Sequence, residues 1–291
     1  MKGEFWQKED RSEKYYLAIQ LIQMRIKKDK EYKQEIKDFF HFYQDNFSWG
    51  GGGKETTESF EKGLIIFPSS LKKLIKNYIL VDLDERHKGN WDEVVKKQFL
   101  NARAVKYKKQ AFIAPVWELV NHDVISLPFI LNLGGVCIPN YPPMSGEIKQ
   151  SYNNTSSLNR FFRYGFISEE TIVFSVPFSI NLKECGLIIN CKGESLDNDS
   201  MIIERGTNTI TITGLPIADV NNPGLPNDYF NEILRKSGDS NIPKDLLLKI
   251  IELNRIIRKK IIDESKLIDN QVSNMLIKVI NYELNLISND N

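Results

Sequence analysis

The sequence predicts an α+β fold, and three observations along its 291 residues support this class. Near the amino terminus, apolar residues recur every three or four positions, as on one face of an amphipathic helix. Short apolar or alternating segments, typical of strands, fill the middle of the chain. Helical spacing then returns over residues 245–287. Because the strands do not alternate regularly with helices, this order favours α+β over a doubly wound sheet.

The first expected elements are three helices and one strand. An apolar stripe predicts helix over residues 13–47, with lysines on a solvated face. Four consecutive glycines follow, and the apolar run at residues 64–67 then predicts a short buried strand that Pro68 ends. Two further helices are expected, over residues 70–80 and 91–105.

Strand signals dominate the middle of the chain, and the alternation over residues 209–213 (TITIT) is the strongest of them. The expected strand segments are 111–120, 124–133, 135–140, 171–176, 186–193, 200–206 and 209–215. Residues 158–162 fit one or two helical turns, and the prolines and glycine of residues 223–226 mark a loop. Two or three amphipathic helices are expected over residues 245–287.

Composition and charge limit the classes of function. The chain is 41% hydrophobic and 26% charged, which is typical of a globular protein. A net charge of +1 disfavours direct nucleic-acid binding through a global basic field. No apolar run is long enough to span a membrane, and the polar amino terminus is unlike a signal peptide. A cytoplasmic protein is therefore expected, with a nuclear location left open. The three cysteines and three histidines lack ligand spacing, so no metal is expected.

Four short stretches carry the functional prediction. They are the glycine-rich GGGGKETTESFEKGL with Gly51, Gly53 and Gly63, NARAV at 101–105, APVWELVNHD at 114–123, and GEIKQSYNNTSSLNRFFRYGF at 146–166. In this order and spacing they resemble the SET-domain protein methyltransferases, particularly the branch related to the Rubisco large-subunit methyltransferase. The resemblance implies a β-rich core with a knotted C-terminal crossing over residues 48–170. It also implies a C-terminal lobe at 171–291 that helps to bind a protein substrate, whereas the N-terminal helical segment at 1–47 follows from the apolar stripe alone and has no fixed counterpart in the family.

The resemblance implies that S-adenosylmethionine is the cofactor. Gly51 and Gly53 would hold its methionine end, since a glycine lets backbone groups approach without a Cβ in the way. A flexible linker is the alternative reading of these glycines. A phosphate-binding loop is a poorer match, because Glu55 stands where Ser or Thr would hold magnesium. Arg103 would pair with the cofactor carboxylate, and a surface ion pair is its alternative role.

The remaining site residues follow from the same resemblance. Asn121 offers both a donor and an acceptor, so it would meet the cofactor's amino group. His122 would act through its backbone near the adenine, or be a buried core histidine. Tyr152 would form a wall of the pocket. Tyr164 would place its hydroxyl beside the transfer site and is the expected catalytic residue, with an aromatic core role as the alternative.

The leading functional prediction is methyl transfer from S-adenosylmethionine to a lysine ε-amine of a protein. Such a transfer depends on orientation and on a desolvated amine, and it requires neither a metal nor a covalent intermediate. The alternative is a SET-like binding module that has lost catalysis and whose C-terminal helices engage a protein partner. A third reading is a scaffold unrelated to SET domains, in which those helices form oligomers. The protein substrate, the degree of methylation and the oligomeric state stay open.

Overall fold

The computed structural model groups the chain into two compact units. Unit 1 contains Met1–Ile65 and Glu85–Tyr152, and unit 2 contains Ile66–Asp84 and Asn153–Asn291. The structure describes residues 6–7, 34–47, 49–79, 83–103, 105–107, 110–112, 119–128, 130–132, 135–137, 149–152, 154–194, 201–237, 242–243 and 245–289. The expected helix between residues 13 and 33 lies outside the described residues.

The described part of the chain is mixed α and β with small sheets, which confirms the coarse prediction of the fold class. The SET-like knotted crossing stays a prediction, as does the division of the chain at residues 47 and 170. Among the described helices, none combines the length and the apolar character that a membrane crossing requires.

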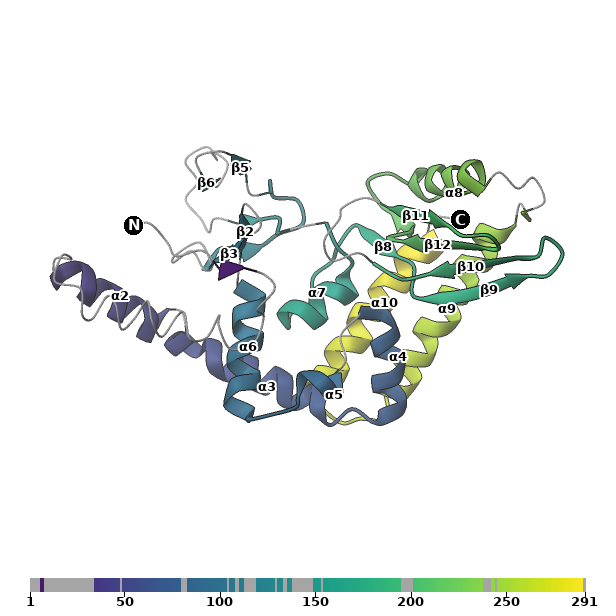
Figure 1. Ribbon diagram of the computed structural model, residues 1–291. Helices are drawn as coiled ribbons and strands as arrows, with labels where there is room; N and C mark the ends of the chain where they lie inside the picture. The colour runs from purple at the N-terminus through teal and green to yellow at the C-terminus, as the bar shows by residue number, and fades with distance from the viewer. Residues whose placement is uncertain are drawn as a thin grey trace. The chain divides into compact units, whose positions relative to one another are not determined.

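The four consecutive glycines belong to the π-type turn η1 (Trp49–Gly53), which lies in sequence between two helices of unit 1, α2 (Gln34–Asn46) and α3 (Lys54–Ile65). Figure 1 labels these helices and a third, α6 (Trp91–Arg103). Helix α3 packs on α6, and Lys54 at its start forms an ion pair with Asp92 at 3.2 Å. The side chain of Asn90 accepts a hydrogen bond from the Asp92 amide at 3.0 Å, so Asn90 caps the start of α6.

The glycines of η1 are required by the local backbone. A Cβ built on Gly51 would lie 2.4 Å from the carbonyl oxygen of Asn46, closer than any real Cβ contact. Gly52 has a φ of +86°, in the left-handed region that residues with a side chain rarely adopt. Together these two residues let the chain end α2 and begin α3 within a few positions. This intramolecular requirement differs from the cofactor contact that the sequence suggested for Gly51.

The prediction of a strand at residues 64–67 is wrong. Leu64 lies inside α3 and is fully buried, and Phe60, one helical turn earlier, is buried beside it. This four-residue spacing places both side chains on one face of a helix. A short apolar run cannot by itself distinguish a buried strand from a buried helical turn. Gly63 also lies within α3 instead of preceding a strand.

A buried carboxylate on α3 joins this helix to the chain that follows α5 (Leu83–Arg86). The Glu61 side chain is fully buried and forms an ion pair with the Arg86 guanidinium. Its second oxygen lies 2.9 Å from His87 Nε2. The His87 side chain is itself only 3% exposed, and its ring lies 6.2 Å from the Trp91 ring at the start of α6. Glu61 therefore links α3 to the segment that leads into α6.

The strands of unit 1 are short. β3 (Gln110–Phe112) pairs antiparallel with both β1 (Trp6–Gln7) and β2 (Val105–Tyr107), while β5 (Ile130–Asn132) pairs antiparallel with β6 (Gly135–Cys137). β4 (Asn121–His122) pairs parallel with β7 (Lys149–Gln150). The expected strand at 111–120 is thus formed only at its start, and residues 113–118 lie outside the described part. Of the segment 124–133, only the part within β5 is a described strand.

The sheets of unit 2 carry its core. The larger sheet has the order β11-β12-β10-β9, and a second pair joins β13 (Pro216–Asp219) to β8 (Ile172–Phe174). The larger sheet consists of β9 (Phe178–Leu182), β10 (Leu187–Cys191), β11 (Ile202–Arg205) and β12 (Thr209–Thr213). Alternation along β10 and β12 directs Ile189, Ile210 and Ile212 into a cluster with helix side chains such as Phe230 and Ile250.

Apart from α8, the described helices of unit 2 match the sequence prediction. They are α4 (Ser69–Ile79), α7 (Ser157–Tyr164), α8 (Leu225–Ser237), α9 (Leu246–Ser265) and α10 (Gln271–Asn289). The loop expected at residues 223–226 ends early, because α8 begins at Leu225 and includes Pro226. Proline is tolerated in the first turn of a helix, since amides there have no partner within the helix.

Candidate functional site

Two of the four motif stretches meet at the β4–β7 pairing in unit 1. Asn121 lies opposite Lys149 and His122 opposite Gln150, in parallel register. The Asp123 amide continues the pairing with a hydrogen bond to the Gln150 carbonyl at 3.0 Å. The segment that carries "NH" and the segment that carries "KQSY" therefore lie side by side. The Asn121 side chain is exposed.

Tyr152, two residues after β7, contacts His122 of β4. The Tyr152 amide donates a hydrogen bond to His122 Nδ1 at 3.2 Å, and the two ring centroids are 5.1 Å apart. The Tyr152 hydroxyl donates to the carbonyl of Val120. Because Nδ1 accepts a hydrogen bond, the neutral His122 ring carries its proton on Nε2. The structure thus brings together three of the predicted cofactor residues: Asn121, His122 and Tyr152.

Arg103 and the glycine turn meet through a shared aromatic side chain. The Arg103 guanidinium lies 4.6 Å from the ring centroid of Phe99, which is cation–π distance. The Trp49 ring packs edge-on against the same Phe99 ring at 4.6 Å. Trp49 opens the turn that contains Gly51 and Gly53. Arg103 and the first residue of the glycine turn, Trp49, therefore contact the same aromatic ring.

Tyr164 belongs to unit 2, whereas the predicted cofactor residues belong to unit 1. Tyr164 is the last residue of α7, which ends at Gly165 in a left-handed conformation (φ 79°). The guanidinium groups of Arg160 and Arg163 lie 5.6 and 5.4 Å from the Tyr164 ring centroid. The Phe166 ring lies 6.0 Å away. The tyrosine is therefore half-buried between two cations and an aromatic ring.

The other end of α7 is held by buried carboxylates that the sequence reasoning missed. The Ser156 hydroxyl accepts a hydrogen bond from the Asn159 amide and so caps the helix. Glu194 accepts hydrogen bonds from the Ser156 amide at 3.1 Å and from its hydroxyl at 2.7 Å. Glu283 accepts one from the Leu158 amide at 2.8 Å. Negative charge near the N-terminus of a helix is stabilising, because the positive end of the macrodipole lies there.

The sequence did contain a signal for one of these groups. Arg258 is fully buried on α9, and its guanidinium bonds to Glu283 on α10 at 2.9 Å. Glu283 occupies the apolar stripe of its helix, three positions after Ile280 and four before Ile287. A charged residue inside such a stripe predicts a buried ion pair, because an unpaired charge is too costly to bury.

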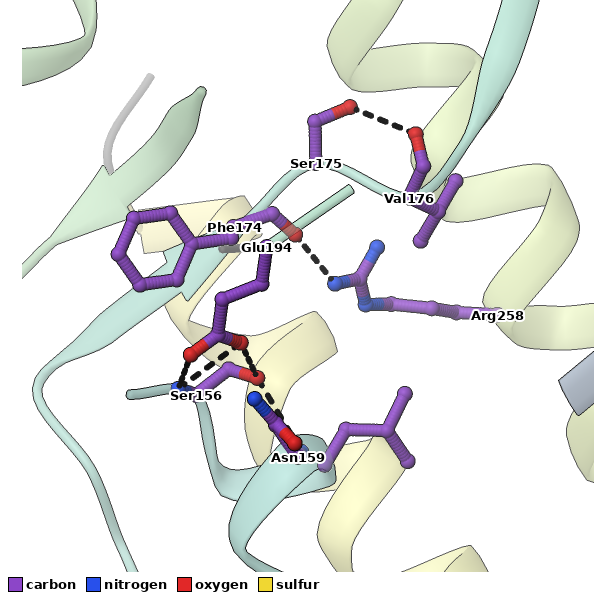
Figure 2. A pocket seen from close by; sticks show the side chains of 8 residues that line it. Ser156, Asn159, Phe174, Ser175, Val176, Glu194 and Arg258 are labelled. Atoms are coloured by element: carbon purple, nitrogen blue, oxygen red, sulfur yellow. Dashed lines mark hydrogen bonds between the residues drawn. The ribbon is translucent and has the colours of Figure 1, made fainter. Parts of the chain in front are cut away.

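A small cavity lies beside this cluster (Figure 2). Figure 2 shows the Glu194 carboxylate turned toward Ser156 and the Arg258 guanidinium directed at the Phe174 carbonyl, to which it bonds at 3.0 Å. The cavity volume of about 20 Å³ accommodates one water molecule. A nucleoside cofactor requires a volume more than ten times larger. This cavity is therefore not a cofactor pocket.

Glu194 makes the stability of unit 2 depend on pH. Burial raises the pKa of Glu194, and hydrogen bonds from Thr155, Ser156 and Asn159 only partly oppose this rise. The folded protein therefore retains the Glu194 proton to higher pH than the unfolded chain does. The stabilising contribution is complete below the ordinary carboxyl pKa and is lost as pH rises through the folded value.

We expect Glu194→Gln to remove this pH dependence. The variant should gain stability relative to the native chain as pH rises above the ordinary carboxyl pKa. Urea unfolding followed by circular dichroism at several pH values measures the difference. Glu204→Gln, at a carboxylate whose side chain is 64% exposed on β11, is the matched control. Parallel pH profiles for native chain and Glu194→Gln would contradict the assignment.

Within the described residues, no three His, Cys, Asp or Glu side chains gather as a metal site would require. In comparisons with known proteins, no family model, no curated protein and no solved structure matches this chain.

Proposed function

We propose that this protein is an S-adenosylmethionine-dependent methyltransferase that acts on a lysine side chain of another protein. The observation that carries the proposal is the pairing of β4 with β7. This pairing brings Asn121 and His122 beside Tyr152, although the two segments are far apart in sequence. The order of the four motif stretches supports the same reading.

The residues of unit 1 fit the groups of this cofactor. The exposed Asn121 side chain offers a donor and an acceptor for an amino-acid moiety. The half-buried rings of His122 and Tyr152 border the same pairing and offer an apolar wall. Arg103 carries the cation that suits a carboxylate. When bound, S-adenosylmethionine supplies the methyl group and accepts the electrons of the broken bond on its sulfur.

Tyr164 is the proposed catalytic residue. Its hydroxyl oxygen accepts a hydrogen bond from the neutral lysine amine and orients the nitrogen lone pair for in-line attack. The amine must lose its hydration before the attack, and the product amine loses its extra proton to solvent. Neither step needs a metal or a covalent link to the protein.

Cofactor binding is the first test, because it requires no knowledge of the substrate. Calorimetric titration should show micromolar binding of S-adenosylmethionine and S-adenosylhomocysteine. Asn121→Ala should abolish this binding, whereas the control Asn281→Ala, at an exposed asparagine on α10, should leave it unchanged. Tyr164→Phe should bind normally but transfer less radiolabelled methyl to lysate proteins. Absence of binding of either ligand to the native chain would refute the proposal.

A second candidate function is a binding module without catalysis. The exposed apolar side chains Leu248 and Ile256 on α9, and Leu267 just after it, favour this reading, since they are 59%, 56% and 81% exposed. A protein partner would cover them. Retained cofactor binding with no methyl transfer to any lysate protein would favour this candidate over the enzyme.

A further inference from the structure

Helix α7 connects a buried ion pair to the proposed catalytic tyrosine. It has eight residues, and Ser157 to Phe162 are all buried. Its first turn contacts the carboxylate of Glu283, which accepts a hydrogen bond from the Leu158 amide at 2.8 Å. Its last residue is Tyr164. A short helix buried over most of its length moves as one body, so its start and its end cannot shift independently.

Glu283 is itself held in one place by Arg258. The guanidinium donates from Nε to Glu283 at 2.9 Å, and from its other nitrogens to Asn254 Oδ1 at 2.8 Å and to the Phe174 carbonyl at 3.0 Å. The same Asn254 Oδ1 also accepts a hydrogen bond from the Val176 amide at 2.8 Å. Three partners in different directions fix the plane of the guanidinium, and the Glu283 carboxylate is fixed with it.

Helix α10 also contacts the chain that follows Tyr164. The hydroxyl of Tyr282, next to Glu283, donates to the Glu170 carbonyl at 3.0 Å. The Glu170 carboxylate accepts hydrogen bonds from Ser168 Oγ at 2.6 Å and from Arg160 Nε. Arg160 is fully buried on α7, and its guanidinium also faces the Tyr164 ring. Helix α10 thus forms hydrogen bonds both with the start of α7 and with the segment that follows the end of α7.

The geometry points to Glu283, held by Arg258, as a positioning residue for Tyr164. Loss of the Glu283 acceptor removes one of the hydrogen bonds that hold the first turn of α7, and the helix, with Tyr164 at its far end, changes position. The inference rests on the proposed function only where it concerns turnover. The movement of the Tyr164 ring itself is independent of that function.

Fluorine NMR of protein labelled with 3-fluorotyrosine tests this inference directly. The Tyr164→Phe variant identifies the Tyr164 resonance by its loss. We expect Glu283→Met, which has no oxygen to accept the Leu158 amide, to shift this resonance, whereas Glu252→Met, at a carboxylate 57% exposed on α9, should not. If Glu283→Met does not fold, the double variant Arg258→Met with Glu283→Met is measured instead, because it leaves no unpaired buried charge.

Kinetics separate positioning from stability. For folded enzyme, kcat should fall roughly 10- to 100-fold in the variant that shifts the resonance, while the affinity for S-adenosylmethionine stays unchanged. A purely structural role for Glu283 would lower only the melting temperature. An unmoved Tyr164 resonance in a folded variant would overturn the inference. A shifted resonance in a protein whose native form transfers no methyl would support the positioning role and reject the methyltransferase.

Discussion

Glu61→Ala is expected to destabilise unit 1 by about 3–5 kcal/mol. The native carboxylate is fully buried and contacts both the Arg86 guanidinium and His87 Nε2. The Arg86 side chain is only 10% exposed, so loss of Glu61 leaves a positive charge in a poorly hydrated place. His87 loses its hydrogen-bond acceptor at the same time. A domain of this size has a total stability of about 5–15 kcal/mol, so the change removes much of it.

Tryptophan fluorescence during urea unfolding measures this effect selectively. All four tryptophans, at positions 6, 49, 91 and 117, belong to unit 1. The control is Glu55→Ala, an exposed carboxylate in the first turn of the same helix, which should cost about 0.3–1 kcal/mol. If Glu61→Ala proves no more costly than this control, Arg86 and His87 have regained their hydration and the cluster is not a buried ion pair.

The second large effect is expected at Arg258. Arg258→Met should cost about 3–5 kcal/mol, because it leaves the fully buried Glu283 carboxylate without its cation. The Asn254 side chain and the Phe174 carbonyl also lose a donor. Unit 2 contains no tryptophan, so its unfolding is followed by far-ultraviolet circular dichroism.

A double-mutant cycle isolates the contribution of the pair. With Arg258→Met combined with Glu283→Met, both charges are gone. The Leu158 amide has lost its acceptor, and Asn254 and the Phe174 carbonyl have lost a donor, at about 1–3 kcal/mol for each group left unsatisfied. The double variant should therefore be more stable than Arg258→Met alone. If the double variant loses as much stability as the two single variants together, the two side chains are not energetically coupled.

The long periodic helices could be predicted from the sequence, because each buries one face over several turns. The stripes of α9 and α10 are confirmed, and so are the helix at α4 and the alternating strand β12. The run at residues 64–67 failed because four apolar residues fit both periods. Helix α8 was missed because Pro226, which reads as a loop signal, lies in its first turn.

Only part of the candidate site could be predicted from the sequence. Local motifs placed Asn121, His122 and Tyr152 in one group, and these residues do lie together. Glu194 and Glu283 could not be placed, since their partners on α7 lie 38 and 125 residues away in sequence. Contacts over such separations depend on the packing of the whole unit, which no short stretch encodes. The roles of the predicted residues in catalysis stay predictions.

The order of the chain through the two units has a consequence for synthesis and truncation. The chain crosses between the units after residues 65, 84 and 152. Helix α4 packs on α9, and Ser70 donates a hydrogen bond to Glu264, 194 residues later, at 2.6 Å. On the ribosome, α4 therefore emerges long before its partner and exposes an apolar face until α9 is made. For the same reason, a fragment that stops at residue 152 would carry α4 without α9, so neither unit can be produced by a single cut.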